Sequence, residues 1–256
     1  MPFVEIATGA RLHYEEWNNA AAGDPVIVVH GMLGTATVDL AETNEYIASL
    51  GWRVIAPTLR GYGESTPKPR DFPPRFYDRD AADVMAFCDA LGIERAHLVG
   101  YSDGGEVVLV CAGQYPERCL SVAAWGAVGY FGEQMRPVAQ NPRMISGEAI
   151  TPEEVALHGI DPVQFGRSWV RAVVQYIDSG GDVSLSRASQ ITCPLLLMLG
   201  HEDRLNPAAF AQQFLAQAGH GELVMFDCGH AIHTEQPEAF RRTLAAFLRR
   251  PDEKAG

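Results

Sequence analysis

The chain has 256 residues, of which 47% are hydrophobic and 20% are charged, as in ordinary globular proteins. Its 32 acidic and 20 basic side chains give a formal net charge of −12 at pH 7. Because no basic run occurs, the composition argues against binding to nucleic acid or to an anionic membrane surface.

The N-terminal sequence MPFVEIATGARLHYEEW lacks the basic start, apolar core and small-residue cleavage site of a signal peptide. No apolar run approaches the roughly 20 residues that are needed to cross a bilayer. The five cysteines are odd in number and show no C-x-x-C spacing, so we expect neither disulfides nor a metal site. A reducing, cytoplasmic compartment is therefore expected.

Apolar, β-branched runs without alternation predict strands that are covered on both faces, as in a parallel sheet. In chain order these runs are VIVVHG (26–31), RVIAPT (53–58), HLVGYS (97–102), SVAAWGA (121–127), PLLLMLG (194–200) and ELVMFD (222–227). Helical patterns separate them, which predicts an α/β fold with a mostly parallel, doubly wound sheet. The first segments, FVEIAT and RLHYEEW, predict an antiparallel hairpin at one edge.

One region breaks the alternation of strands and helices. After the strand that ends at Ala127, no strand signal returns until Cys193. Between them, TPEE (151–154) combines a capping box with proline at the first helical position, and FGRSWVRAVVQYI (165–177) predicts an amphipathic helix. Insertions of this size usually have a function. We therefore predict a helical cap or lid at 128–190 and a core formed by 1–127 and 191–256.

The sequence GYSDG (100–104) matches the G-x-S-x-G pattern. A predicted strand runs straight into a helical pattern here, so Ser102 falls on a sharp turn that exposes its hydroxyl. This context predicts the nucleophile elbow of an α/β-hydrolase fold. The alternative is a glycine-rich turn with no chemistry.

A serine hydroxyl needs a histidine that takes its proton and an acid that orients the histidine. In this fold the chain order is serine, acid, histidine. Asp203 follows the strand after the insertion, and His230 follows the last strand and Gly229. We therefore predict Ser102, Asp203 and His230 as the catalytic triad.

Other acids and histidines compete for these positions. Glu202 adjoins Asp203 but is out of phase and a methylene longer, and Asp227 ends a strand that we expect to face elsewhere. His233 is the nearest rival of His230 and is expected to line the pocket or face solvent. His201 is expected on the surface, and His30 is expected to be a structural, hydrogen-bonding histidine.

Acyl chemistry also needs hydrogen-bond donors for the developing oxyanion, and losing one typically costs about 100- to 1000-fold in rate. The backbone N–H groups of Asp103 and Met32 are the predicted donors, because Asp103 follows the nucleophile and Met32 lies in the loop after the first parallel strand. The alternative for Met32 is ordinary packing of its side chain in the core.

The carboxylate of Asp103 stands where negative charge develops during the attack. Its position at a helix N-terminus gains only roughly 0.3–1 kcal/mol. Repulsion of an oxyanion about 4–6 Å away would cost roughly 3–4 kcal/mol at an effective dielectric constant near 20. An ammonium group beside the scissile carbonyl would cancel this cost, so Asp103 is predicted to bind the amine of an α-amino acid ester. Stabilisation by the helix dipole remains the alternative explanation for an aspartate at position 103.

Several segments together resemble the valacyclovir hydrolases, also called biphenyl hydrolase-like proteins. They are GMLG (31–34), RGYGES (60–65), RDFPPRFYDRDAADV (70–84), GYSDGG (100–105), WGAVGY (125–130), GHEDRLNP (200–207) and CGHAIH (228–233). The likeness covers most of the chain and is weakest in the insertion. It implies a serine esterase of α-amino acid esters that uses no cofactor, with the same triad and with Asp103 as the amine-binding acid.

The predicted activity is therefore a two-step hydrolysis of a small-molecule ester. A general carboxylesterase, a lactonase or a carbon–carbon bond hydrolase on the same fold remain alternatives, as does a receptor of this fold. Four side chains of the insertion are candidates for the acyl pocket, and packing of the insertion on the core explains them equally well: Tyr130, Phe131, Met135 and Trp169. The oligomeric state, monomer or homodimer, stays open.

Overall fold

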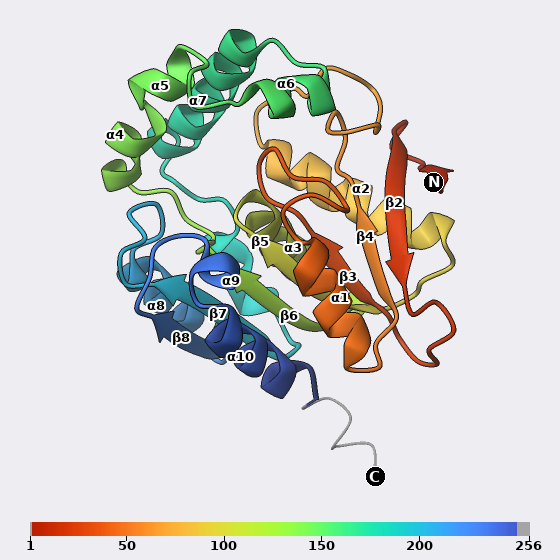
Figure 1. Ribbon diagram of the computed structural model, residues 1–256. Coiled ribbons are helices and arrows are strands. Elements are labelled where there is room, and N and C mark those ends of the chain that lie inside the picture. Colours follow the sequence, from red (N-terminus) through yellow and green to blue (C-terminus); the bar gives the residue numbers. More distant parts are fainter. Residues whose placement is uncertain (1, 250–256) are drawn as a thin grey trace.

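The computed structural model describes residues 2–249 and has an eight-stranded sheet at its centre (Figure 1). Its spatial order is β1-β2-β4-β3-β5-β6-β7-β8. The strands are β1 (Phe3–Glu5), β2 (Arg11–Trp17), β3 (Val26–Val29), β4 (Val54–Pro57), β5 (Ala96–Tyr101), β6 (Cys119–Trp125), β7 (Leu195–Gly200) and β8 (Glu222–Phe226). The strands from β3 to β8 are parallel, and β1 and β2 form an antiparallel pair beside β4. The predicted sheet and edge hairpin are both confirmed.

Helices cover both faces of this sheet, as expected for strands without polar alternation. One face is covered by α1 (Ala41–Ser49), α9 (Ile232–Glu235) and α10 (Pro237–Arg249), and the other by α2 (Phe76–Ala90), α3 (Asp103–Gln114) and α8 (Ala208–Ala218) (Figure 1). A short 3-10 helix, η1 (Pro116–Arg118), leads from α3 into β6. No helix between residues 2 and 249 is both long and apolar enough to cross a membrane.

The insertion (residues 128–190) leaves the sheet after β6 and returns at β7. It contains η2 (Glu133–Met135), α4 (Arg136–Ala139), α5 (Pro142–Ile145), α6 (Pro152–His158), α7 (Pro162–Asp178) and η3 (Leu185–Gln190). Its α-helices lie on the side toward which the parallel strands point (Figure 1). That side carries the carboxyl ends of the strands, where sites in open α/β sheets form.

The sequence signals for the longer helices of the insertion are confirmed. The Thr151 side chain and Glu154 form the reciprocal capping box at the start of α6. Helix α7 begins at Pro162, before the predicted Phe165, because the Asp161 carboxylate accepts the Gln164 backbone N–H at 2.7 Å and caps the helix.

Two buried ion pairs fasten α2 to the loop that follows β4. The Arg70 guanidinium donates to both carboxylate oxygens of Asp80, and each side chain is 1% exposed. The Arg60 guanidinium donates to both oxygens of Asp83 at 2.7 Å. Paired in this bidentate way the charges are satisfied, whereas either one alone would be a buried, uncompensated charge.

Replacing Asp80 by Ala is therefore expected to lower the free energy of unfolding by about 3–5 kcal/mol, because Arg70 would keep a buried charge without a partner. Urea denaturation measures this change. The matched control is Asp71→Ala, which breaks a 2.7 Å ion pair between Arg79 and the 64% exposed side chain of Asp71. It should cost less than about 1 kcal/mol. Equal losses in the two variants would contradict the role given to the Asp80 pair.

Candidate active site

Ser102 sits between the end of β5 and the first residue of α3, with φ 53° and ψ −120°. Such a positive φ is costly for a residue with a side chain. The surrounding packing allows it only with glycine at two neighbouring positions: a Cβ at Gly100 would lie 2.3 Å from the Gly104 carbonyl oxygen, and a Cβ at Gly104 would lie 2.2 Å from the Val29 carbonyl oxygen. Strand and helix thus approach closely, and the turn between them has the form that the G-x-S-x-G pattern predicts.

The structure brings Ser102, His230 and Asp203 into one hydrogen-bonded row. His230 Nε2 lies 2.9 Å from Ser102 Oγ, and His230 Nδ1 lies 2.8 Å from Asp203 Oδ2. With Asp203 ionised, Nδ1–H donates to its carboxylate, and Nε2 is left to accept the serine proton. The geometry is the one in which a serine hydroxyl can be deprotonated by imidazole.

Asp203 is held by its own loop. Its Oδ1 accepts the Leu205 backbone N–H at 2.9 Å, and its Oδ2 accepts the Asn206 side-chain amide at 3.0 Å. Burial alone would raise the pKa of Asp203, but hydrogen bonds from His230 and Asn206 and the nearby imidazole lower it below the usual value. Asp203 is therefore a carboxylate at neutral pH. Asn206 also donates to the Gly126 carbonyl at 2.9 Å and ties this loop to the end of β6.

The competing acids and the competing surface histidine lie away from Ser102. Glu202 is exposed, and the exposed Asp227 pairs instead with the exposed His201, whose Nε2 lies 3.7 Å from its carboxylate. The expectation that His201 is a surface residue is confirmed.

The remaining histidines are engaged elsewhere. His233 Nδ1 accepts the indole N–H of Trp125 at 3.1 Å, so His233 is a packed side chain and not a solvent-facing one. His30 accepts the Leu59 backbone N–H at its Nε2 (2.9 Å), and its Nδ1 lies 2.7 Å from the Gly31 carbonyl oxygen. Burial lowers the pKa of His30 to about 4. His30 is therefore neutral and structural, as the sequence analysis expects.

Cysteine nucleophiles are disfavoured by their surroundings. All five thiols are buried and free. Burial raises the pKa of Cys88 to about 12 and that of Cys193 to about 11, so both stay protonated at neutral pH. Residues 2–249 contain no group of three or more His, Cys, Asp or Glu side chains placed to hold a metal ion.

A cavity of about 290 Å³ opens beside Ser102 and His230. It is lined by Met32, Tyr101, Ser102, Asp103, Val138, Asn141, Met144, Trp169, Leu205 and His230. Both residues predicted to supply oxyanion donors therefore lie at the cavity. Neither the Met32 nor the Asp103 backbone N–H is hydrogen-bonded to another residue within 2–249, so both are free to bind a substrate atom.

Of the four side chains of the insertion that are predicted for the pocket, the structure brings one, Trp169, to the cavity. The other three pack elsewhere. Tyr130 packs edge-on against Phe210, Phe131 packs against Tyr77 and Tyr176, and Met135 is buried in the hydrophobic core. For these three, the alternative of packing on the core describes their contacts.

Several lining residues were missed because they lie on short helices. Val138 belongs to α4, Met144 to α5, and Asn141 is the N-cap of α5, whose side chain accepts the Arg143 backbone N–H. A signal was present: an asparagine before a proline is a strong helix start. Asn141-Pro142 therefore could have predicted α5, whereas its orientation toward Ser102 could not be predicted.

Asp103 occupies an unusual position at this cavity. It is only 9% exposed, its Oδ1 accepts the Tyr77 hydroxyl at 2.6 Å, and its Oδ2 is buried without a hydrogen-bond partner in residues 2–249. Burial raises the pKa of Asp103, while the Tyr77 hydrogen bond and the charge of Arg70 oppose that rise. A buried carboxylate oxygen without a partner is costly unless a ligand satisfies it.

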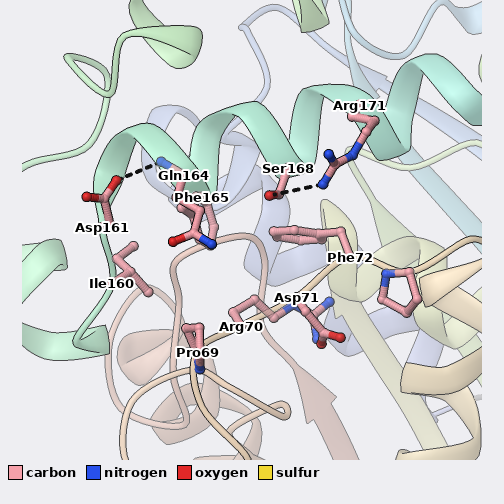
Figure 2. Close-up of a pocket in the computed structure, with 11 residues that line it drawn as sticks. Pro69, Arg70, Asp71, Phe72, Ile160, Asp161, Gln164, Phe165, Ser168 and Arg171 are labelled. Carbon is pink, nitrogen blue, oxygen red and sulfur yellow. Dashed lines mark hydrogen bonds between the residues drawn. The ribbon is translucent and has the colours of Figure 1, made fainter.

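A second cavity, of about 330 Å³, lies between α7 and the loop at residues 69–73 (Figure 2). Along α7, the Gln164 backbone N–H donates to Asp161 at 2.7 Å, and Arg171 donates to Ser168 at 3.4 Å. These polar groups are satisfied along the helix, and Ser102 and His230 do not line this cavity. The residues suited to acyl transfer therefore line the cavity beside Ser102 and His230, and not this one.

Comparison with known proteins gives two informative relatives. The chain is 30% identical over 246 residues to serine hydrolase BPHL of Mus musculus, and the match covers 94% of this chain and 84% of that protein. It is 28% identical over 259 residues to the 2-hydroxy-6-oxo-6-phenylhexa-2,4-dienoate hydrolase of Burkholderia cepacia, and that match covers 90% of each.

Solved structures support the same fold. The enol-lactonase from Burkholderia xenovorans LB400 superposes with a TM-score of 0.71 at 23% identity over 97% of this chain and 100% of that one. The family model described as alpha/beta hydrolase fold matches residues 24–154. With the elbow and the parallel sheet already in place, these findings show that the chain belongs to the α/β-hydrolase fold family and resembles serine hydrolase BPHL.

Proposed function

We propose that this protein is a serine ester hydrolase that acts on esters of α-amino acids. The observation that carries the proposal is the continuous row of hydrogen bonds from Asp203 through His230 to Ser102, placed on the strained turn between β5 and α3. The similarity to serine hydrolase BPHL over most of the chain supports the same reaction class.

In the proposed mechanism, neutral His230 takes the Ser102 proton as the hydroxyl oxygen attacks the ester carbonyl. The backbone N–H groups of Met32 and Asp103 then hold the oxyanion. Asp203 keeps the imidazole oriented and stabilises its protonated form. His230 next protonates the leaving alcohol. In the second step, His230 takes a proton from water as the water oxygen attacks the acyl-enzyme, and it returns that proton to Ser102 as the acid leaves.

The amine preference follows from the charge at the cavity. The ten lining residues include one acid, Asp103, and no Arg or Lys. A carboxylate about 5 Å from a developing oxyanion opposes it by roughly 3 kcal/mol at an effective dielectric constant near 20. A substrate ammonium between the two charges removes this penalty and supplies the partner that Asp103 Oδ2 lacks.

Carbon–carbon bond hydrolysis is the second candidate, and the Burkholderia cepacia relative is named as a hydrolase of a dienoate. A dienoate is a carboxylate anion, and the lining of this cavity offers it no Arg or Lys. The buried Asp103 would repel such a substrate. The cavity therefore favours a cationic ester over an anionic dienoate.

We also infer that residues 128–190 form a cap over the catalytic edge of the sheet. Val138, Asn141, Met144 and Trp169 from this segment line the cavity opposite the triad. Three of the four side chains are apolar, so the acyl group that fits beside them is an apolar amino acid side chain.

Replacing Ser102 by Ala is expected to lower kcat for p-nitrophenyl acetate by at least about 10⁴-fold, because the nucleophile is lost, and His230→Ala should do the same. The absorbance of the released p-nitrophenolate measures the rate. His201→Ala is the control, since His201 is exposed and pairs only with the exposed Asp227. Wild-type turnover by the Ser102 variant would end the proposed mechanism.

Replacing Asp103 by Asn is expected to lower kcat/KM for valine methyl ester by about 100-fold or more, because the ammonium loses its charged partner. The methyl ester of 3-methylbutanoic acid lacks only the amine, and its kcat/KM should change far less or rise. Glu202→Gln, which removes an exposed carboxylate next to Asp203, should leave the ratio of the two esters unchanged. Equal losses on both esters would refute the amine-binding role.

The amine preference should depend on pH. Recognition needs the ionised Asp103, so the preference is present above the pKa of Asp103 and is lost as the pH falls through it. Because burial raises this pKa, the loss begins at a higher pH than the value of about 3.9 for an exposed aspartate would give. The ratio of kcat/KM for the two methyl esters, followed from neutral to acid pH, measures this loss, since any pH effect on the shared steps of the reaction cancels in the ratio.

The pH dependence of protein stability tests independently whether the pKa of Asp103 is raised. A raised folded-state pKa means that ionisation of Asp103 disfavours folding, so its stabilising contribution is present at low pH and is lost as the pH rises. Asp103→Asn should therefore gain stability relative to the wild type as the pH increases. A stability difference that stays constant with pH would contradict the raised pKa.

A further inference from the structure

His158 ends α6 in the insertion, yet its side chain is fully buried among loops of the core. Its Nδ1 accepts the Gly63 backbone N–H at 2.9 Å, and its Nε2 lies 2.9 Å from the Leu33 carbonyl oxygen. Because the Gly63 amide can only donate, Nε2 must carry the ring proton and donate it to Leu33. Only the neutral imidazole with its proton on Nε2 satisfies both bonds.

Leu33 belongs to the loop that holds the predicted oxyanion donor. Its carbonyl shares a peptide group with the Gly34 N–H, and that N–H donates to the Gly31 carbonyl at 3.2 Å. The Gly31 carbonyl in turn shares a peptide group with the Met32 N–H. In a trans peptide the C=O and N–H point in opposite directions, so each bond fixes the direction of the next amide.

His30 holds the same loop from the core side. Leu59 N–H donates to His30 Nε2, so His30 Nδ1 carries the proton and donates to the Gly31 carbonyl at 2.7 Å. Leu33 itself has a φ of 62°, a conformation that a leucine does not adopt without support. The loop thus relies on bonds from both sides, one from the core and one from the insertion.

We propose that His158 is a positioning residue that couples docking of the insertion to the orientation of the Met32 oxyanion donor. The proposal rests on the proposed function, in which Met32 N–H binds the oxyanion. His158 donates to the Leu33 carbonyl, the adjoining Gly34 amide is then directed at Gly31, and the Met32 amide is turned toward the cavity. When the insertion is detached, this row of peptide groups loses its outer support.

The surroundings of His158 favour its neutral form. Burial lowers the pKa of His158, and the charge of Lys68 lowers it further, while its hydrogen bond to Leu33 and the charge of Glu154 oppose this. The Tyr62 ring packs edge-on against the imidazole, and Tyr62 separates it from the equally neutral His30. The bond to Leu33 therefore persists at neutral pH.

Two substitutions separate the bonds of His158. The amide of Gln reaches the position of Nε2 and can still donate to Leu33, whereas the shorter Asn places its oxygen near Nδ1 and can accept only from Gly63. Each variant keeps one hydrogen bond and loses one. With p-nitrophenyl acetate, His158→Asn should lower kcat about tenfold or more with little change in KM, below the roughly 100- to 1000-fold cost of losing a donor outright.

His158→Gln should keep kcat within about threefold of wild type, although it loses comparable stability. The control is Lys68→Met, which removes the 2.9 Å bond from Lys68 Nζ to the His158 carbonyl oxygen and leaves both hydrogen bonds of the His158 ring in place. It should lower the melting temperature and leave kcat unchanged.

Hydrogen exchange of the Gly34 backbone amide measures the same coupling in the absence of substrate. Exchange should accelerate in His158→Asn and not in His158→Gln. Equal kcat and equal Gly34 exchange in the Asn and Gln variants would overturn the proposal. If the wild-type protein hydrolyses no ester, the proposed function fails, and Gly34 exchange alone then supports or overturns the coupling.

Discussion

The strained backbone at Ser102 is the constraint on which the rest of the site depends. A positive φ at a residue with a side chain typically costs about 1–3 kcal/mol. The close approach of β5, β3 and α3, which Gly100 and Gly104 permit, holds the turn in place. Since the same turn begins α3, it sets both the hydroxyl and the free Asp103 amide at one end of the cavity. The core strands therefore position the proposed nucleophile and one oxyanion donor together.

Two aspartates near Ser102 show how burial can produce opposite chemistry. Asp203 accepts hydrogen bonds from the imidazole, an amide side chain and a backbone amide, and its pKa falls. Asp103 accepts one hydrogen bond, from Tyr77, and its pKa rises. The Asp203 carboxylate therefore has hydrogen-bond partners on both oxygens, whereas Oδ2 of Asp103 has none in residues 2–249 and can accept from a cationic donor. This contrast supports the proposal that Asp203 orients the base and that Asp103 recognises an ammonium group.

Sequence patterns predicted the core better than the insertion for a physical reason. Buried parallel strands and the G-x-S-x-G turn depend on local composition, so their positions, and those of Asp203 and His230 after their strands, follow from the order of elements. Helices α4 and α5 are four residues each, and although Asn141-Pro142 marks the start of α5, tertiary contacts that local propensity does not encode turn both helices toward Ser102. For that reason Tyr130, Phe131 and Met135 were proposed for the pocket, and Val138 and Met144 were not.

The division between core and insertion also separates two determinants of substrate choice. Asp103 is the first residue of α3 in the core, so the proposed preference for an ammonium comes from the helix that directly follows the proposed nucleophile. Val138, Met144 and Trp169 come from the insertion, so the proposed limit on the size of the acyl group comes from helices outside the elbow. His158 joins the two units, because its ring lies on the Leu33 carbonyl and the Gly63 amide of the core. A change in the insertion that preserves this bond would alter acyl selectivity, while one that breaks it would reduce turnover for every ester.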